Sequence, residues 1–332
     1  MRPELSIIIP VYDRAKELQT CLGTLRPHLD GLHSEIIIID DASPDEGPKE
    51  IAASFGARYF KNDRRQGSAY SKNLGIDQSS GDILLFLDSD IELLDCTSLP
   101  EMIAVLKNTP FCGQVGGEAI LDISGKVTHI FGRNIDERTG RSRSDYFDVR
   151  QYSSPIRYDY IPTSNCMVKR SDAARINGFD DYYAVLGEDK DFGYRLGRIG
   201  LHSYVIPNGV VLHHFATTAR RDGQLDKQYR TQVRFCLRHY GIGTATIGLF
   251  RDELLAIRLR TKPEPIPKNS AIERFEQRYV TEILRVKNTK RGAHKRFDAI
   301  LRLVRAIVWN VFHFKGIGRE GSRSPLNASA RY

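Results

Sequence analysis

A chain of 332 residues with 41% hydrophobic and 27% charged residues can form one large α/β domain with appendages, or two modest domains. Its five cysteines are widely spaced and form no CxxC pair, so a structural zinc site is not expected, and reduced, buried cytosolic thiols fit best. The N-terminal apolar stretch is too short for a signal peptide, and no run of 18 or more uncharged apolar residues occurs, so no bilayer-spanning segment is expected.

The net charge of +8 is unevenly distributed along the chain. Residues 251–332 hold 19 Lys and Arg against 8 Asp and Glu, whereas residues 1–250 are slightly acidic. The basic character therefore belongs to the tail and not to the body of the protein.

Strands and helices alternate over the first 110 residues. Apolar runs predict buried strands at residues 5–10, 35–40 and 83–87, with a weaker strand at 57–60; apolar spacing predicts helices at 14–26 and 67–78. Strands that alternate with helices imply parallel pairing with right-handed crossovers.

The pattern is looser after residue 110. Strands are predicted at 116–121, 127–135, 160–168 and 210–213, a mobile polar loop at 133–150, a helix at 187–199 and a Pro-rich linker at 262–268. No internal repeat is present.

Acidic residues follow three of the predicted strands: Asp13 after the first, Asp40 and Asp41 after the second, and Asp88 and Asp90 after the fourth. The carboxyl ends of parallel strands share one edge of the sheet, where open α/β sheets bind ligands. Carboxylates there can accept hydrogen bonds from a nucleobase and a ribose, or bind a metal ion. A single such residue is usually a cap or turn residue, but three together favour nucleotide binding.

Three further segments carry candidate chemistry. Arg64 and Arg65 precede a helix whose N-terminal amides, after Gly67, could receive an anion, although a plain basic loop would look the same. Glu188 and Asp189 begin a helix, where acids commonly stabilise the macrodipole but where a general base could also sit; Lys190 and Asp191 are expected to face solvent or the opposite side.

The third segment is the pair His213 and His214 at the end of the last predicted strand. A strand-end histidine can be a metal ligand, although a lone histidine is more often a structural group. Adjacent strand residues point to opposite faces, so at most one of the two is expected to bind a metal ion.

Taken together and in order, these segments resemble the family 2 glycosyltransferases of GT-A fold. The matching segments are SIIIPVYDR at 6–14, EIIIIDDASPD at 35–45, GSAYSKNLGI at 67–76 after Asn62, GDILLFLDSD at 81–90, GFDD at 178–181, GEDKDFGYRL at 187–196 and VLHH at 211–214. The QxxRW signature of processive members is absent, which favours a non-processive enzyme; the Ala42 that follows the Asp pair, where the family often has Gly, alters a turn.

The resemblance implies roles for individual residues. Pro10, Tyr12, Asp13, Asp41, Arg64, Arg65, Asp88 and Ser89 would bind the nucleotide sugar; Asp90, Asp88 and His213 would hold Mn²⁺ or Mg²⁺; Asp189 would be the catalytic base, with Glu188 orienting a sugar. It also implies a GT-A type, Rossmann-like, mostly parallel sheet flanked by helices.

The implied activity is inverting, metal-dependent transfer of a sugar from a nucleoside-diphosphate sugar, UDP- or dTDP-linked, to a hydroxyl of a glycan or lipid-linked acceptor. The transferase domain is expected at residues 1–245, with a nucleotide-sugar half at 1–110 and an acceptor half at 111–245. Residues 246–332 are expected to form a basic helical C-terminal extension. The expected location is cytoplasmic, at the inner face of the membrane, and no nucleic acid is expected as a partner.

Within that extension, residues 296–315 place eight apolar side chains on one helical stripe flanked by Arg302 and Arg305. Such a helix either packs on its own domain or lies in the membrane interface, where flanking Lys and Arg attract anionic lipids. Liposome co-sedimentation with and without residues 290–332 separates the two.

Two other function classes are weighed against the transferase. A sugar-nucleotide-forming nucleotidyltransferase would carry a Gly-rich basic loop after the first strand, where this chain has Pro10, Val11 and Tyr12. A catalytically degenerate nucleotide-binding scaffold is disfavoured by the complete set of Asp88, Asp90, Asp189 and His213. Calorimetric titration with UDP and Mn²⁺ would discriminate among the three.

Overall fold

The computed structural model describes residues 2–94, 98–117, 119–123, 126–130, 132–137, 139–144, 152–183, 186–214 and eight residues between 231 and 240. The chain divides into two compact units, Met1–Ile135 with Ser142–Ala219 and Asp136–Arg141 with Arg220–Tyr332. All predicted site residues belong to the first unit. The Pro-rich linker and the helical C-terminal extension lie outside the described residues, and the boundary at residue 245 stays a prediction.

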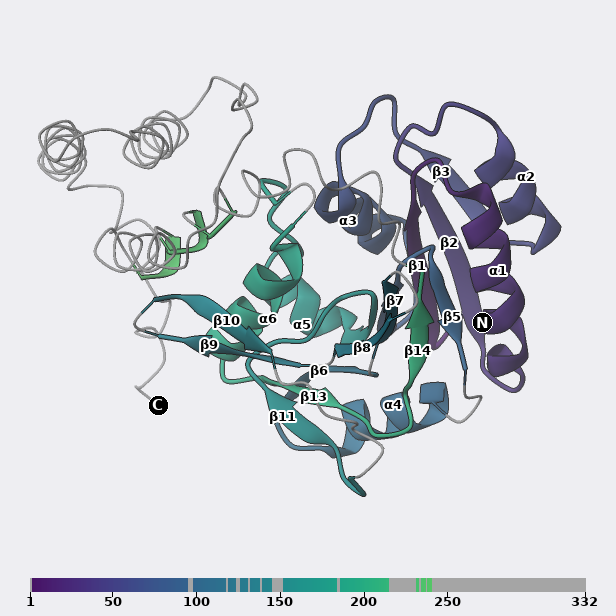
Figure 1. Ribbon diagram of the computed structural model, residues 1–332. Coiled ribbons are helices and arrows are strands. Elements are labelled where there is room, and N and C mark those ends of the chain that lie inside the picture. Colours follow the sequence, from purple (N-terminus) through teal and green to yellow (C-terminus); the bar gives the residue numbers. More distant parts are fainter. Residues whose placement is uncertain are drawn as a thin grey trace, which may run out of the picture. The chain divides into compact units, whose positions relative to one another are not determined.

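An eight-stranded sheet forms the centre of the first unit (Figure 1). Its strands, in spatial order, are β11 (Ile156–Tyr158), β13 (His202–Val205), β6 (Cys112–Gly116), β12 (Asn165–Lys169), β4 (Ile83–Leu87), β1 (Leu5–Val11), β2 (Ser34–Asp40) and β3 (Arg58–Lys61). Strands β4, β1, β2 and β3 pair in parallel, whereas β12 runs antiparallel to both β4 and β6. The expected mostly parallel sheet is therefore confirmed.

Helices cover both faces of this sheet. The helices are α1 (Ala15–Leu25), α2 (Gly47–Ser54), α3 (Ser68–Gln78), α4 (Ser98–Asn108), α5 (Arg170–Arg175) and α6 (Glu188–Arg198), with a 3₁₀ turn at Arg26–Leu29. Ile7 and Ile9 of β1 pack with α1, α2 and α4, while Ile8 between them packs with α3, α5 and α6. This alternation explains the uninterrupted apolar sequence of β1, because a strand covered on both faces has no side that meets water.

Strand β1 lies between β2 and β4, and this position creates the binding edge. The chain builds outward from β1 to β2 and β3 and then returns to place β4 on the other side. Open α/β sheets bind ligands in the crevice at such a switch point, beyond the carboxyl ends of the strands. The acidic ends of β1, β2 and β4 therefore lie next to one another, as predicted.

A second, four-stranded sheet follows the order β5 (Ile91–Leu93), β14 (Val211–His213), β7 (Ala119–Ile123) and β8 (Lys126–Ile130). The predicted single strand at 116–121 is wrong, because β6 ends at Gly116 in the first sheet and β7 begins at Ala119 in the second. Gly117 marks the change: a Cβ there would lie 1.6 Å from the carbonyl oxygen of Gly209, so only glycine allows this close approach of two backbones.

Three other predictions in this part of the chain need correction. The strand predicted at 127–135 is divided between β8 and β9 (Arg133–Asp136), and the loop predicted at 133–150 contains β9 and β10 (Arg141–Ser144), which pair with each other. The strand predicted at 160–168 begins only at Asn165. Short polar strands carry little apolar periodicity, so the sequence pattern did not distinguish them from loops.

Four cysteines, Cys21, Cys112, Cys166 and Cys236, are buried free thiols, as expected from their spacing; Cys96 lies outside the described residues.

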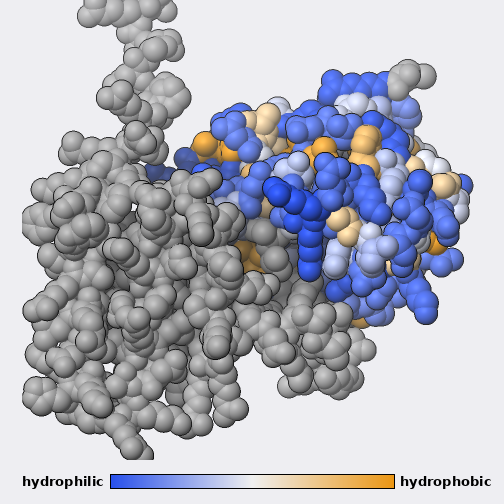
Figure 2. Space-filling view, turned by 90° about the horizontal axis from the view of Figure 1, so that it is seen from above, coloured by the Kyte–Doolittle hydropathy of each residue, from blue (hydrophilic) through white to orange (hydrophobic). Residues whose placement is uncertain are grey.

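No helix among the described residues has both the length and the apolar character needed to cross a bilayer. The described residues that are coloured in Figure 2 are mostly hydrophilic, with scattered hydrophobic ones, which is ordinary for a surface in contact with water.

Glu35 at the start of β2 makes a hydrogen-bond network that predicts acid sensitivity. Its carboxylate accepts hydrogen bonds from Ser6, Ser80 and Arg58 at 2.6–2.8 Å. Partial burial alone would raise its pKa, but these hydrogen bonds outweigh burial and lower the pKa of Glu35 to about 2.

Because the pKa is lower in the folded state than in the unfolded state, Glu35 stabilises the fold above pH 4.5, and this contribution is lost as the pH falls towards 2. The Glu35→Gln variant should therefore be less stable than the wild type at pH 7 but lose less stability between pH 5 and pH 2. Thermal unfolding followed across this pH range measures the difference. Glu50→Gln, at an exposed position of α2, serves as the control and should follow the wild-type profile.

Candidate active site

The end of β4 forms a tight acidic turn. The Asp88 amide donates to the carbonyl oxygen of Ser164 at 2.9 Å, and the Ile91 amide donates to that of Asp88 at 3.2 Å. Asp90 is 3% exposed, whereas Asp88 is only half-buried. The turn therefore places one carboxylate in the protein interior and the other at the edge of the sheet, and it leads directly into β5.

Strand pairing brings His213 to this turn. Strand β14 runs antiparallel to β5 with His213 opposite Ile91, and the His214 amide donates to the carbonyl oxygen of Asp90 at 2.8 Å. In this register His213 Nε2 lies 3.1 Å from Asp90 Oδ1. The neighbouring His214 instead pairs with Glu92 at 2.5 Å, so only one of the two histidines faces the acidic turn.

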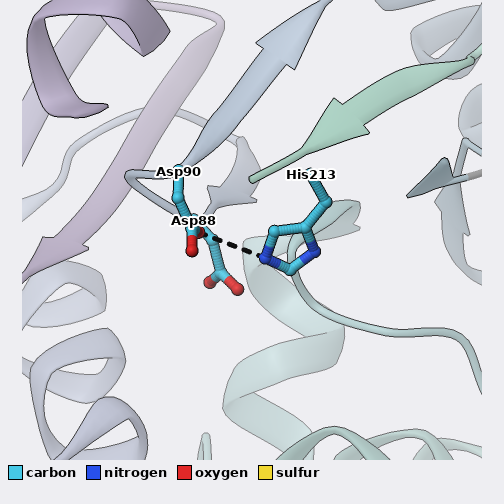
Figure 3. Close-up of side chains that lie close together, drawn as sticks. All are labelled: Asp88, Asp90 and His213. Atoms are coloured by element: carbon cyan, nitrogen blue, oxygen red, sulfur yellow. Dashed lines mark ion pairs between the residues drawn. The ribbon is translucent and has the colours of Figure 1, made fainter. Parts of the chain in front are cut away.

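Asp88, Asp90 and His213 form a cluster that can hold a cation (Figure 3). One ligand atom from each of the three lies within 4.8 Å of the others. Two carboxylate oxygens and one imidazole nitrogen suit a divalent ion such as Mn²⁺ or Mg²⁺, which prefers oxygen ligands. The residues present therefore fit the metal ion that the family resemblance implies.

A positive group lies beside this cluster. Arg14, at the start of α1, forms an ion pair and hydrogen bond with Asp90 Oδ2. Burial alone would raise the pKa of Asp90, but its hydrogen bond with His213 and the charge of Arg14 more than offset burial and lower it. Asp90 is thereby kept as a carboxylate, the form that binds metal ions.

Helix α6 begins close to the same edge, and an aromatic cluster holds it there. Phe192 of α6 stacks on Phe179 with a centroid distance of 4.3 Å, and both rings make edge contacts with Phe86 of β4 at 6.0 and 5.0 Å. Phe86 is two residues before Asp88, and Phe192 is three residues after Asp189. The helix starts after Gly187, whose φ of +90° is accessible to glycine at little cost.

The first residues of α6 have different environments. Glu188 is buried, and its pKa is raised by that burial and by the charges of Asp189 and Asp88, against the effect of Lys72. Asp189 is partly exposed, and its Oδ1 accepts a hydrogen bond from the Lys190 amide at 2.7 Å. Asp189 is thus open to solvent, whereas Glu188 beside it is enclosed.

Of the two alternatives expected for Lys190 and Asp191, solvent or the opposite side of the helix, the first is wrong. Lys190 is 7% exposed and Asp191 is fully buried. Asp191 accepts a hydrogen bond at 2.6 Å from Arg195, one turn further along α6, and this ion pair allows a carboxylate to be buried on the helix.

Lys72 of α3 joins the two acidic segments and was not recognised from the sequence. Its ammonium group donates to Thr163 Oγ1 at 2.7 Å and lies 3.4 Å from Glu188 Oε1 and 3.9 Å from Asp88 Oδ1. The only available signal is its position: buried Ala69 and Gly75 flank it at three-residue spacing, so Lys72 replaces an apolar residue on the inward face of α3.

The end of β2 is also tied to the loop that follows β3. Asp41 accepts hydrogen bonds from the side chain of Asn62 at 2.9 Å and from the amides of Gln66 and Gly67 at 2.7 and 2.8 Å. These three bonds fix the loop that carries Arg64 and Arg65, and they occupy most of the acceptor positions of Asp41.

The remaining predicted nucleotide-binding residues differ in their contacts. Arg65 lies over the ring of Tyr12 with its guanidinium carbon 4.1 Å from the centroid, while Arg64 is exposed without a described link to the cluster. The Asp13 amide donates to Ser43 Oγ at 2.9 Å. Pro10 is half-buried in β1, and Ser89 is buried between the two acids of the turn.

The family model described as "Glycosyl transferase family 2" matches residues 6–171, which is half of the chain. The chain belongs to this family. The match covers β1 to β4, the acidic turn at 88–90 and Lys72, but ends before Asp189 and His213. The GT-A family assignment inferred from the ordered motifs is therefore confirmed.

Two relatives show how much of each protein is shared. The glycosyltransferase AglE of Haloferax volcanii is 42% identical over 94 residues, 26% of this chain and 31% of the relative. The GalNAc(5)-diNAcBac-PP-undecaprenol beta-1,3-glucosyltransferase of Campylobacter jejuni is 29% identical over 151 residues, 43% of this chain and 47% of that enzyme. The chain thus spans less than half the length of either relative.

A solved structure supports the fold over most of the chain. The crystal structure of GalNAc-T7 with UDP, GalNAc and Mn²⁺ superimposes with a TM-score of 0.60 at 15% identity, covering 94% of this chain and 58% of that one. At this identity the likeness establishes the GT-A fold alone.

Proposed function

We propose that the chain transfers a sugar, with inversion, from a nucleoside-diphosphate sugar to a hydroxyl group of a glycan or lipid-linked acceptor. The observation that carries this proposal is the cluster of Asp88, Asp90 and His213 at the switch point of the sheet. Sugar transfer from a diphosphate donor needs a nucleotide site with a cation beside the diphosphate. The cluster lies where α/β sheets bind nucleotides and could supply that cation.

In this proposal Asp88, Asp90 and His213 hold Mn²⁺ or Mg²⁺. When bound, the ion would act as a Lewis acid that neutralises charge on the diphosphate. The nucleotide side of the site is formed by the ends of β1 and β2 with Tyr12 and Arg65. These residues are close to the metal cluster in the chain and in space, because Arg14, two residues after Tyr12, contacts Asp90. A ring and a guanidinium at this edge suit a nucleobase and a phosphate.

Asp189 is the proposed general base. Its carboxylate takes the proton of the acceptor hydroxyl while that oxygen forms a bond to the anomeric carbon. The bond between this carbon and the diphosphate oxygen breaks, and the diphosphate leaves with the electron pair. One displacement from the opposite face inverts the configuration. Asp189 suits this task because its carboxylate is partly exposed, whereas that of Glu188 is buried. Asp189 is also near the metal cluster, because its charge acts on Lys72, which contacts Asp88.

The acceptor class is proposed from a relative's name and from the chain's own tail. The Campylobacter jejuni enzyme is named for a polyprenol-linked substrate. The basic tail, with 19 Lys and Arg in residues 251–332, suits a peripheral position at the cytoplasmic face of a membrane.

A screen of nucleotide sugars tests the proposed function. The purified chain is incubated with UDP-, dTDP- and GDP-linked sugars, first with EDTA and then with Mn²⁺ or Mg²⁺, and the release of nucleoside diphosphate is measured. We expect release from one or a few donors, dependent on the divalent ion, and an inverted anomeric product by NMR. No release from any donor, tested also with lipid-linked acceptors, would refute the proposal.

A further inference from the structure

Lys72 is a buried cation that touches three segments far apart in the sequence. It is 1% exposed, and its ammonium group contacts Asp88 at the end of β4, Thr163 in the loop before β12 and Glu188 at the start of α6. The ring of Phe179 lies 5.5 Å from the same group. One side chain therefore links the metal-binding turn to the helix that carries Asp189.

Stability alone is a weak explanation for this arrangement. Burying an ammonium and a carboxylate costs desolvation energy, and apolar residues of similar volume are often as stable or more stable at such positions. The surroundings already provide an apolar core, since Ala69, Phe86 and Phe192 pack in the same cluster. The charge of Lys72 therefore suggests a role that a methionine would not fulfil.

The ammonium group of Lys72 lies between two carboxylates: Glu188 Oε1 is 3.4 Å away and Asp88 Oδ1 is 3.9 Å away. A charged Lys72 balances two carboxylates that would otherwise repel each other across the gap between β4 and α6. The distance between the acidic turn and the start of α6 is thus set by a group placed between them.

We propose that Lys72 is a positioning residue that fixes the first turn of α6, and with it Asp189, relative to the metal-binding turn at Asp88. This inference rests on the proposed function for its kinetic consequence. Its structural consequence, an ordered start of α6, stands independently. Lys72 acts through Glu188 and Asp88 and not by contact with substrate.

The test compares Lys72→Met with the wild type by kinetics and by hydrogen exchange. A misplacement of about 1 Å can cost roughly 100-fold in rate, so we expect kcat to fall by about that factor. KM for the donor should change by less than about threefold, because Tyr12, Arg65 and Asp90, on the nucleotide side and in the metal cluster, keep their contacts in this variant. The Asp191 amide, which donates to the Gly187 carbonyl oxygen at 3.0 Å in the first turn of α6, should exchange about tenfold faster.

Arg195→Met is the matched control, because it breaks a second buried ion pair of α6, with Asp191, that does not include Asp88. It should lower the unfolding temperature but leave kcat within about twofold.

A double-mutant cycle between Lys72→Met and Glu188→Gln should be strongly non-additive, since both changes remove the same interaction. Lys72→Arg, which keeps the charge, should restore part of kcat. If Lys72→Met does not fold, Thr163→Val removes one partner of the ammonium and should lower kcat in the same direction.

The outcomes separate this inference from the proposed function. Wild-type kcat in folded Lys72→Met, or an equal loss in Arg195→Met, would overturn the positioning role while leaving the transferase intact. An unchanged exchange rate of the Asp191 amide would overturn it whether or not activity is found. A wild type without activity on any donor would instead refute the proposed function, and hydrogen exchange would still decide the role of Lys72.

Discussion

Replacing Asp189 by Asn should nearly abolish sugar transfer while leaving donor binding close to normal. An amide of the same shape keeps the hydrogen bond from the Lys190 amide to Oδ1 but accepts no proton at neutral pH. General-base assistance is typically worth about 10²–10⁴-fold, so kcat should fall by that range. Single-turnover transfer measures the rate, and calorimetric titration with the donor measures binding.

Asp82→Asn is the control for this variant. Asp82 lies just before the opposite end of β4 and pairs with Arg2 at the surface, so its loss should leave kcat and donor affinity within about twofold of the wild type. Turnover of Asp189→Asn within a few-fold of the wild type would show that Asp189 is not the base.

Replacing Asp90 by Asn should remove metal-dependent nucleotide binding. Asp90 is the buried member of the cluster and contacts both His213 and Arg14. Loss of an outer partner of a metal ligand already costs about 10–100-fold in affinity or activity, so loss of the ligand itself should cost at least about 100-fold. Titration of Mn²⁺ with and without UDP measures the affinity.

The adjacent histidines offer a matched pair for the same experiment. His213→Gln should weaken Mn²⁺ binding strongly, whereas His214→Gln, which only loses a surface contact with Glu92, should bind Mn²⁺ as the wild type does. Equal effects of the two changes would show that His213 is not a ligand.

The first half of the fold could be predicted from the sequence because its strands are buried on both faces. The Ile and Leu runs of β1, β2 and β4 predict buried parallel strands, and the boundaries of these strands agree with the structure to within one residue. The short strand β5, which belongs to the second sheet, was not predicted. The acidic ends then follow from topology, since parallel neighbours must end at one edge.

The remainder depends on contacts that no local pattern carries. The pairing of β14 with β5 joins residues 118 to 122 positions apart, and it brings His213 beside Asp90. The motif resemblance named His213, but nothing in the local sequence fixed its partner. The burial of Lys72 and Asp191 was not predicted, because a charged residue in a sequence normally indicates an exposed position. Lys72 is buried against Glu188 on another helix, and Asp191 against Arg195 on the next turn of its own helix.

Diffraction from a crystal containing Mn²⁺ and UDP, with data recorded at the manganese edge, tests the account most directly. The expected result is an anomalous peak within bonding distance of Asp90 and His213, next to the UDP diphosphate, with Asp189 facing the same space. A peak elsewhere, or UDP bound with no manganese between it and the Asp88–Asp90 turn, would contradict the account.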